Sequence, residues 1–113
     1  MPFIDIKTNK TVSNEVFDSV RQTLDELITI FPGKSKTWLM TSLADNCRMA
    51  FSGTDDPCAM IEVKLFGEPQ RSDCERFAKE VCQALSKTLG ILQTRIYVKF
   101  EGCGLWGFFG QLF

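Results

Sequence analysis

The sequence contains no histidine among its 113 residues. Imidazole is the commonest general base in enzymes, and it completes the Ser–His and Cys–His pairs of many hydrolases. Its absence excludes those nucleophilic pairs and any imidazole-based metal site. If the protein is an enzyme, another group that titrates near neutral pH must act as the base. The free amine at the start of the chain is one candidate.

Cysteine pairs with the spacing of a redox or metal site are also missing. The five cysteines form no CxxC motif, and none of them has the ligand spacing of a zinc site. Because no secretory signal is visible, we expect reduced thiols that are mostly small buried hydrophobes: Cys47, Cys58, Cys74, Cys82 and Cys103. We expect neither a metal nor a cofactor.

An excess of charge of one sign and a long apolar run are absent as well. The net charge is −1, with 24% charged residues, which does not indicate nucleic acid or a membrane as a partner. Residues 1–10 lack the apolar stretch of a signal peptide, and no segment has the length of a membrane span. We expect one domain over residues 1–113, in the cytoplasm, and we leave open secretion without a signal peptide.

The hydrophobic pattern predicts strands and two helices. Alternating residues predict strands at 3–8, 37–43, 48–53, 58–66 and 95–101, with 37–43 and 48–53 joined by a short turn. A helix is expected from about Ser13, a suitable N-cap, to Phe31, with a stop at Pro32-Gly33. A second helix is expected from Ser72, where Glu75 suggests a capping box, to a stop at Gly90.

The two halves of the chain repeat the same order of elements. Strand–helix–strand over 3–43 recurs over 58–101. This order predicts an α/β fold of two pseudo-repeated βαβ units, with parallel pairing in each unit and both helices on one face of a four-stranded mixed sheet. The apolar phase of the strands should lie under the helices: Ile4, Ile6, Ile61, Val63, Leu65, Ile96, Val98 and Phe100.

The other phase of the strands mixes charged and large apolar residues. It is too polar for a second helix layer and too apolar for open water. Self-association around a partly wet interior would explain it, and so would an exposed face with scattered aromatic residues. Its members are Phe3, Asp5, Lys7, Trp38, Met40, Met60, Glu62, Lys64, Phe66, Tyr97, Lys99 and Glu101.

The opening MPFIDIKTN places a proline directly before a predicted strand. Removal of Met1 would make Pro2 a free secondary amine, whereas retention of Met1 would leave a peptide nitrogen without a basic lone pair. Burial and a nearby cation both lower an amine pKa, and a lysine about 6 Å away contributes roughly 2.8 kcal/mol, or about two pKa units. Lys34 and Lys99 are candidates for that cation. A proline in this position can also have no role.

The chain resembles the macrophage migration inhibitory factor family of the tautomerase superfamily, which includes D-dopachrome tautomerase. The resemblance rests on the Met-Pro start with Thr8-Asn9, Pro-Gly-Lys at 32–34, MAFSGTDDPCA at 49–59, Gly67, RIYVKF at 95–100 and a glycine- and aromatic-rich tail ending in Phe113. It implies a homotrimer whose sheets surround a central channel. It also implies a pocket at each subunit interface, with Pro2 at its base.

The resemblance further implies a cofactor-free keto–enol tautomerase with Pro2 as the general base. Lys34 would bind a carboxylate or enolate oxygen, a backbone amide near Phe66 would donate to the substrate, and Tyr97 would come from the neighbouring subunit. The vertebrate cytokine carries a substrate-contacting asparagine where Lys99 stands, and a cation there favours a more anionic ligand. The pocket walls would be Trp38, Trp106, Phe108 and Phe113. Phenylpyruvate-like or dopachrome-like compounds, flat aromatic molecules with an anionic end, suit such a slot.

Other interpretations remain open. The protein could be a cytokine-like signalling protein with a vestigial pocket, whose surface engages a receptor or another protein. A hydrolytic relative, a dehalogenase or decarboxylase, would need an activated water, for which Glu62 and Glu101 are unsupported candidates. Lys34 could instead compensate the dipole at the end of the first helix, and the aromatic residues could serve packing alone.

Overall fold

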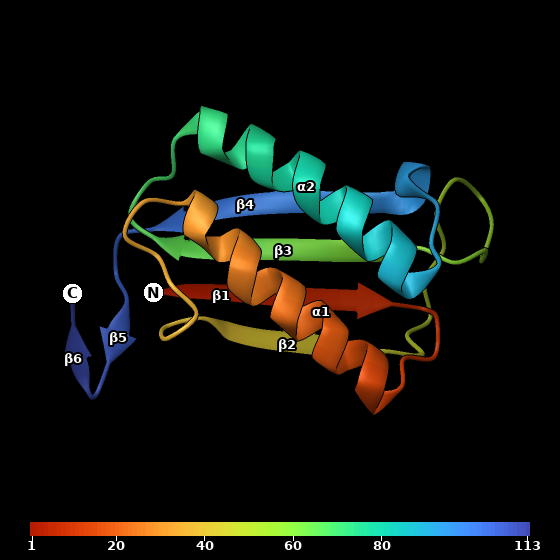
Figure 1. Ribbon diagram of the computed structural model, residues 1–113, viewed down its shortest axis with the longest axis horizontal. Helices are drawn as coiled ribbons and strands as arrows, with labels where there is room; N and C mark the ends of the chain where they lie inside the picture. The colour runs from red at the N-terminus through yellow and green to blue at the C-terminus, as the bar shows by residue number, and fades with distance from the viewer.

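The computed structural model describes residues 1–113 as a two-layer α/β fold. The strands β1 (Pro2–Thr8), β2 (Met40–Ala44), β3 (Ala59–Phe66) and β4 (Ile96–Cys103) form one sheet in the order β2-β1-β3-β4. Helices α1 (Asn14–Leu27) and α2 (Arg71–Leu89) both lie on the same face (Figure 1). β1 pairs with β2, and β3 with β4, in parallel, while β1 and β3 are antiparallel. The predicted pair of βαβ units is confirmed.

The core lies between the sheet and the helices, where the apolar strand phase was expected. Strand residues from β1 and β3, including Ile4, Ile6 and Ile61, have no exposed surface. Phe77 of α2 packs against Phe31 and Phe100, with ring centroids 5.3 and 6.0 Å apart. Val98 and Phe100 lie on the edge strand β4 and are only partly buried. Both helices therefore hold the sheet from one side and leave its other face open.

The helix ends agree with the sequence at two of four positions. Ser13 caps α1, and its side chain accepts a hydrogen bond from the Val16 N–H at 3.2 Å. Gly90 ends α2 with a left-handed φ of 68°. The predicted extension of α1 to Phe31 is wrong, because residues Ile28–Ile30 tighten into a 3-10 turn. The predicted capping box is wrong too, since α2 begins at Arg71 and its N-cap Gln70 makes no side-chain cap.

These caps give a paired stability test. Ser13→Ala removes a satisfied N-cap and is expected to lower the free energy of unfolding by about 1 kcal/mol. Ser72→Ala lies inside the first turn of α2, where alanine is a better helix former, and is expected to be neutral or slightly stabilising. Urea unfolding followed by circular dichroism measures both. An equal loss of unfolding free energy in the two variants would contradict the assignment of Ser13 as a helix cap and of Ser72 as a residue without a capping role.

The predicted strand at 48–53 is wrong. These residues pair with no neighbouring strand. Ser52 and Gly53 have positive φ angles of 53° and 80°, and Phe51 and Thr54 close a tight turn around them with N–H to carbonyl distances of 2.9 and 3.2 Å. The predicted strand at 37–43 begins only at Met40, because residues 35–39 form turns. The tail forms an unpredicted hairpin of β5 (Gly107–Phe108) and β6 (Gln111–Leu112).

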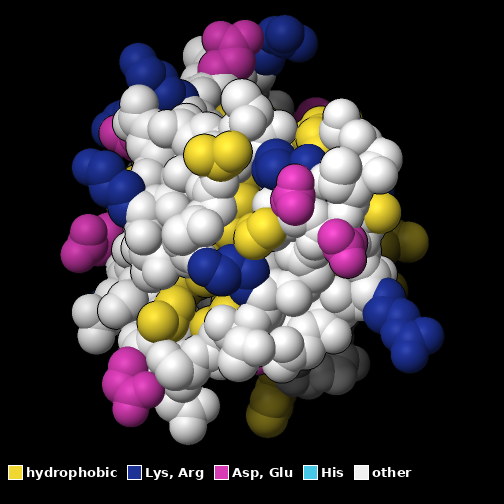
Figure 2. Space-filling view, turned by 90° about the vertical axis from the view of Figure 1, so that its right-hand side faces the viewer, with side chains coloured by type: hydrophobic (Ala, Val, Ile, Leu, Met, Phe, Trp, Pro, Cys, Tyr) yellow, Lys and Arg dark blue, Asp and Glu magenta, His cyan; other side chains and the backbone are white.

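The two ends of the molecule differ in what they carry. Both chain termini and the β5–β6 hairpin lie together at one end, at the left of Figure 1. The opposite end carries the loop between β2 and β3. Figure 2 looks onto that opposite end, where charged side chains of both signs surround small groups of apolar ones. Neither α1 nor α2 is long and apolar enough to cross a membrane.

Candidate active site

A hollow at the terminal end of the molecule contains Pro2, and we call it the Pro2 hollow. Its volume is about 340 Å³, and its lining includes Met1, Pro2, Trp38, Trp106 and Phe108. Trp38 and Phe108 meet edge to face with centroids 5.1 Å apart. The structure therefore brings Pro2 together with three of the four aromatic residues that the sequence analysis assigned to the pocket wall.

Local structure explains this gathering. Pro2 is the first residue of β1 and lies opposite Leu65 of β3, a strand position where the missing N–H of proline is tolerated. The turns before β2 present Trp38. The hairpin presents Trp106 and Phe108 by turning at Phe109 and Gly110, which have positive φ angles of 54° and 75°. Such φ values suit a two-residue hairpin turn.

Phe113, the fourth predicted wall residue, lies next to the hollow. Its ring centroid is 6.3 Å from that of Phe66 and 6.4 Å from that of Phe108. Its N–H donates to the carbonyl of Trp106 at 2.9 Å, which ties the chain end to the hairpin. The C-terminal residue therefore joins the aromatic wall to the strand end that carries Phe66.

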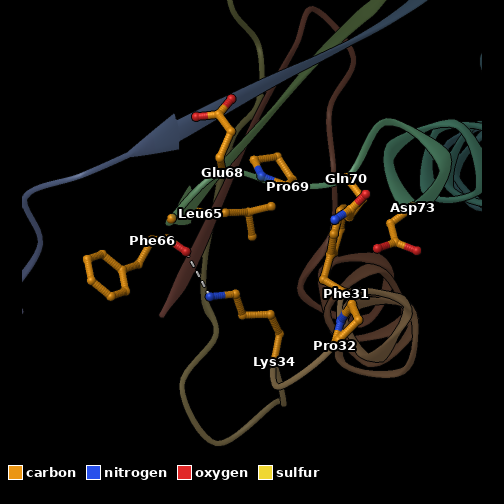
Figure 3. A pocket seen from close by; sticks show the side chains of 10 residues that line it. Phe31, Pro32, Lys34, Leu65, Phe66, Glu68, Pro69, Gln70 and Asp73 are labelled. Atoms are coloured by element: carbon orange, nitrogen blue, oxygen red, sulfur yellow. Dashed lines mark hydrogen bonds between the residues drawn. The ribbon is translucent and has the colours of Figure 1, made fainter.

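A second hollow, which we call the Lys34 hollow, has a volume of about 290 Å³ and is lined by Lys34, Phe66 and the start of α2 among others (Figure 3). Lys34 Nζ donates to the carbonyl of Phe66 at 3.0 Å and lies 6.0 Å from the centroid of the Phe66 ring. The turn at Pro32-Gly33 directs Lys34 there, because Gly33 adopts a φ of 77° and the Lys34 N–H donates back to Phe31.

Met1 lies between these two groups of residues. Its carbonyl accepts a hydrogen bond from the Phe66 N–H at 3.1 Å. Burial, and then the charge and hydrogen bonding of Lys34, lower the pKa of the Met1 amine below its ordinary value. The terminal amine, a cation and a backbone donor thus lie within one small region. Such a set can bind an anion beside an amine whose pKa is lowered.

Tyr97 and Lys99 do not approach Pro2 within one chain. Across the sheet, Pro2 lies level with Leu65 and Gly102, whereas Tyr97 lies level with Met60 at the other end. In the strand register, Lys99 of β4 lies opposite Glu62 of β3, and Glu62 lies opposite Asp5 of β1. Both side chains are exposed on the open face of the sheet. Any contact between them and a Pro2 site requires a second chain.

Glu62 and Glu101 are engaged with Lys99. Lys99 Nζ lies 2.8 Å from a Glu101 carboxylate oxygen and 4.0 Å from one of Glu62. The hydrogen bond and charge of Lys99 lower the pKa of Glu101, and Glu101 in turn raises the pKa of Lys99. A carboxylate stabilised in this way is a weaker base, which disfavours Glu101 as the activator of a hydrolytic water.

The cysteines are free thiols but less buried than expected. Only Cys58 is buried, and the other four are half-buried. No group of three or more Cys, Asp or Glu side chains is arranged to hold a metal ion.

Sequence reasoning missed several residues of the Pro2 hollow. Thr37, Leu39 and Met40 line it, as does the backbone at Gly107. The alternation of Trp38 with Met40 is a signal that could have found Met40. The bond between the Met1 carbonyl and the Phe66 N–H had no sequence signal, because it depends on the register of β1 against β3.

Comparison with known proteins gives a consistent result. The family model described as macrophage migration inhibitory factor matches residues 1–108. The macrophage migration inhibitory factor of Mus musculus is 26% identical over 100 residues, which are 88% of this chain and 86% of that protein.

Solved structures of macrophage migration inhibitory factor homologues are similar to this chain over nearly its whole length. A macrophage migration inhibitory factor homologue from Prochlorococcus marinus is 32% identical, with a TM-score of 0.81 and coverage of 98% of both chains. The MIF2 protein of Leishmania major has a TM-score of 0.94 at 24% identity, covering 100% of this chain and 97% of its own, and supports the same fold.

Proposed function

This chain belongs to the macrophage migration inhibitory factor family of the tautomerase superfamily, and we propose that it is a cofactor-free keto–enol tautomerase in which Pro2, freed by removal of Met1, is the general base. The observation that carries the proposal is the position of Pro2 in an aromatic hollow, next to the Met1 amine, whose pKa is lowered by burial and by Lys34. An amine with a lowered pKa at that place can remove a proton from carbon.

The proton transfer balances without a cofactor. In the enolising direction, the Pro2 nitrogen takes a proton from the carbon next to the carbonyl. The C–H electron pair becomes the C=C bond, and the carbonyl π pair moves to oxygen, which takes the proton from the protonated proline and so regenerates the amine. In the reverse, ketonising direction the unprotonated proline takes the enol hydroxyl proton, carbon takes that proton back from the proline, and the amine is again free. Lys34 offsets the negative charge on the substrate throughout, and the proline ring holds the lone pair in a fixed direction.

Removal of Met1 changes two groups together in this proposal. It shortens the chain by one residue, about 3.8 Å between consecutive Cα atoms, so we expect the new amine to lie within about 4 Å of the Met1 amine whose pKa Lys34 lowers. It also frees the Phe66 N–H, which Met1 occupies here. A substrate carboxylate would then accept from that N–H and from Lys34, while its aromatic ring enters the Pro2 hollow. Phenylpyruvate has the matching flat ring and anionic end.

The test is ketonisation of enol-phenylpyruvate by protein whose N-terminus has been established by intact mass. We expect processed protein to accelerate the reaction and Met1-bearing protein to be inert. Processed protein that leaves the uncatalysed rate unchanged for both phenylpyruvate and a dopachrome-like compound would refute the proposal.

The proposal includes a homotrimer. The open face of the sheet leaves Met40 and Tyr97 67% and 60% exposed, and Tyr97 and Lys99 can contribute to a Pro2 site only from a neighbouring chain. Light scattering coupled to size exclusion is expected to give three times the mass of one chain. A monomer at micromolar concentration would contradict this part of the proposal.

A second candidate function, recognition of another protein, is favoured by one surface. Leu105, Phe109 and Leu112 of the C-terminal segment are 74%, 89% and 72% exposed. An exposed apolar group of this kind is typical of an interaction site. A biological effect that persists after Pro2 is blocked would assign that effect to the surface rather than to catalysis.

A further inference from the structure

Arg95 holds the loop between β2 and β3 through its guanidinium group. Its Nε and Nη atoms donate to the backbone carbonyls of Pro57 at 2.9 Å, Phe51 at 3.0 Å, Asp56 at 2.9 Å and Thr54 at 3.4 Å. The side chains of residues 52–57 are all exposed, so apolar burial does not hold this segment. The loop therefore depends on hydrogen bonds, and one side chain supplies four of them.

The same guanidinium contacts an aromatic ring. The Arg95 Cζ atom lies 5.3 Å from the centroid of the Phe51 ring, within the range of a cation–π contact. Phe51 belongs to the tight turn that its own backbone closes with Thr54. Two independent restraints, the turn and the guanidinium, thus fix the position of the Phe51 ring.

Phe51 in turn contacts Tyr97. Their ring centroids are 4.8 Å apart and the planes are inclined by 80°, an edge-to-face arrangement. Arg95 and Tyr97 are separated only by the buried Ile96 at the start of β4, so both side chains lie on the open side of the sheet. The three groups form one row, in which the Phe51 ring lies between the Arg95 guanidinium and the Tyr97 ring. Tyr97 is 60% exposed as a residue, and Phe51 is its aromatic neighbour within the chain.

We propose that Arg95 is a positioning residue for Tyr97, acting through Phe51, and that it thereby sets the affinity for the aromatic keto acid in the site of the neighbouring subunit. The kinetic part of this inference rests on the proposed function, because there Tyr97 serves a neighbour's Pro2 site. Lysine cannot replace Arg95, since its single ammonium lacks the planar fork that reaches several carbonyls and stacks on a ring.

A structural experiment tests the positioning without any activity. The chain has one tyrosine, so 3-fluorotyrosine labelling places a single ¹⁹F nucleus, at position 97. We expect Arg95→Lys and Phe51→Leu each to shift this resonance toward that of free fluorotyrosine. Phe51→Leu removes the ring and leaves the carbonyls that bind Arg95 in place. The matched control is Arg48→Lys, at an exposed position in the same loop, with no shift expected. An unmoved resonance in both test variants overturns the proposal.

A double-mutant cycle tests the kinetic part. A misplacement of 1 Å can cost up to about 100-fold in rate, so the partial displacement of Tyr97 in Arg95→Lys is expected to raise KM about 10-fold with kcat little changed. In a Tyr97→Ala background, which lacks the ring that Phe51 contacts, the same substitution is expected to change KM less than about twofold, because coupled residues are not additive. Equal effects in both backgrounds would overturn the kinetic part.

The two proposals fail differently. If the wild type is inert while the ¹⁹F resonance responds to Arg95→Lys, the tautomerase proposal fails and the positioning of Tyr97 stands. If the wild type is active and the resonance does not respond, the positioning fails alone.

Discussion

Pro2→Gly, in protein processed to its second residue, is expected to lower kcat/KM for enol-phenylpyruvate by about 100-fold. General base catalysis contributes about 10²- to 10⁴-fold, and the glycine variant retains a primary amine in place of the secondary one, so part of the effect survives. Glycine also loses the ring that fixes the direction of the lone pair. The measurement is steady-state ketonisation at several pH values.

A matched variant separates the base from the shape of the hollow. Insertion of one alanine between Met1 and Pro2 keeps Pro2 and the aromatic side chains of the hollow but converts the Pro2 nitrogen to a peptide amide after processing. A peptide nitrogen has no basic lone pair, so activity is expected to fall to the uncatalysed rate. If this variant retained the wild-type rate, Pro2 could not be the base. The free energy of unfolding, measured in parallel, shows that the fold is intact.

Lys34→Ala is expected to raise KM for an aromatic keto acid by on the order of 10- to 100-fold. A hydrogen bond to a charged group contributes about 1.5–3 kcal/mol, and Lys34 is the cation next to the terminal amine and the Phe66 strand end. Lys36→Ala is the control, because Lys36 is exposed and lines neither the Pro2 hollow nor the Lys34 hollow. Similar losses in both variants would contradict a specific role for Lys34.

Lys34→Ala is also expected to change the dependence of the reaction rate on pH. In the structure the pKa of the Met1 amine is lowered first by burial and then by Lys34, and we expect the same two causes to act on the Pro2 amine that replaces it. The amine is the active base only above its pKa, so the acidic limb of the profile follows this pKa. Removal of Lys34 eliminates one of the two causes, the pKa rises toward its ordinary value, and the limb is expected to move to higher pH. A limb that stays in place would mean that another group controls it.

The fold could be predicted wherever the alternation of apolar residues indicated which face of a strand is buried. The apolar phase that includes Ile4, Ile61 and Leu65 identified the covered face of the sheet, because a half-covered sheet requires alternation. The segment 48–53 has the same composition as a strand, but strand formation depends on a partner at the right register, which residues alone do not reveal. Ser72 likewise has the sequence of a cap, and the helix begins one residue before it.

The site was predictable only in part. The aromatic residues of the tail and Lys34 were named from the family resemblance, and the structure brings them to the terminal end of the sheet. The row of Arg95, Phe51 and Tyr97 was not foreseen, since four long-range contacts to backbone carbonyls leave no pattern in the sequence. The sequence also could not place Tyr97 and Lys99 relative to Pro2, because their separation along the sheet follows from strand register.

The bond between the Met1 carbonyl and the Phe66 N–H has a practical consequence if the proposed function holds. One proteolytic cut then creates the lone pair and vacates the donor in the same event, and no later step reverses it. Catalytic capacity would be set once, soon after translation, by the aminopeptidase of the producing cell. The specific activity of a preparation would accordingly report its processed fraction, and rates from two expression hosts would be comparable only per processed terminus.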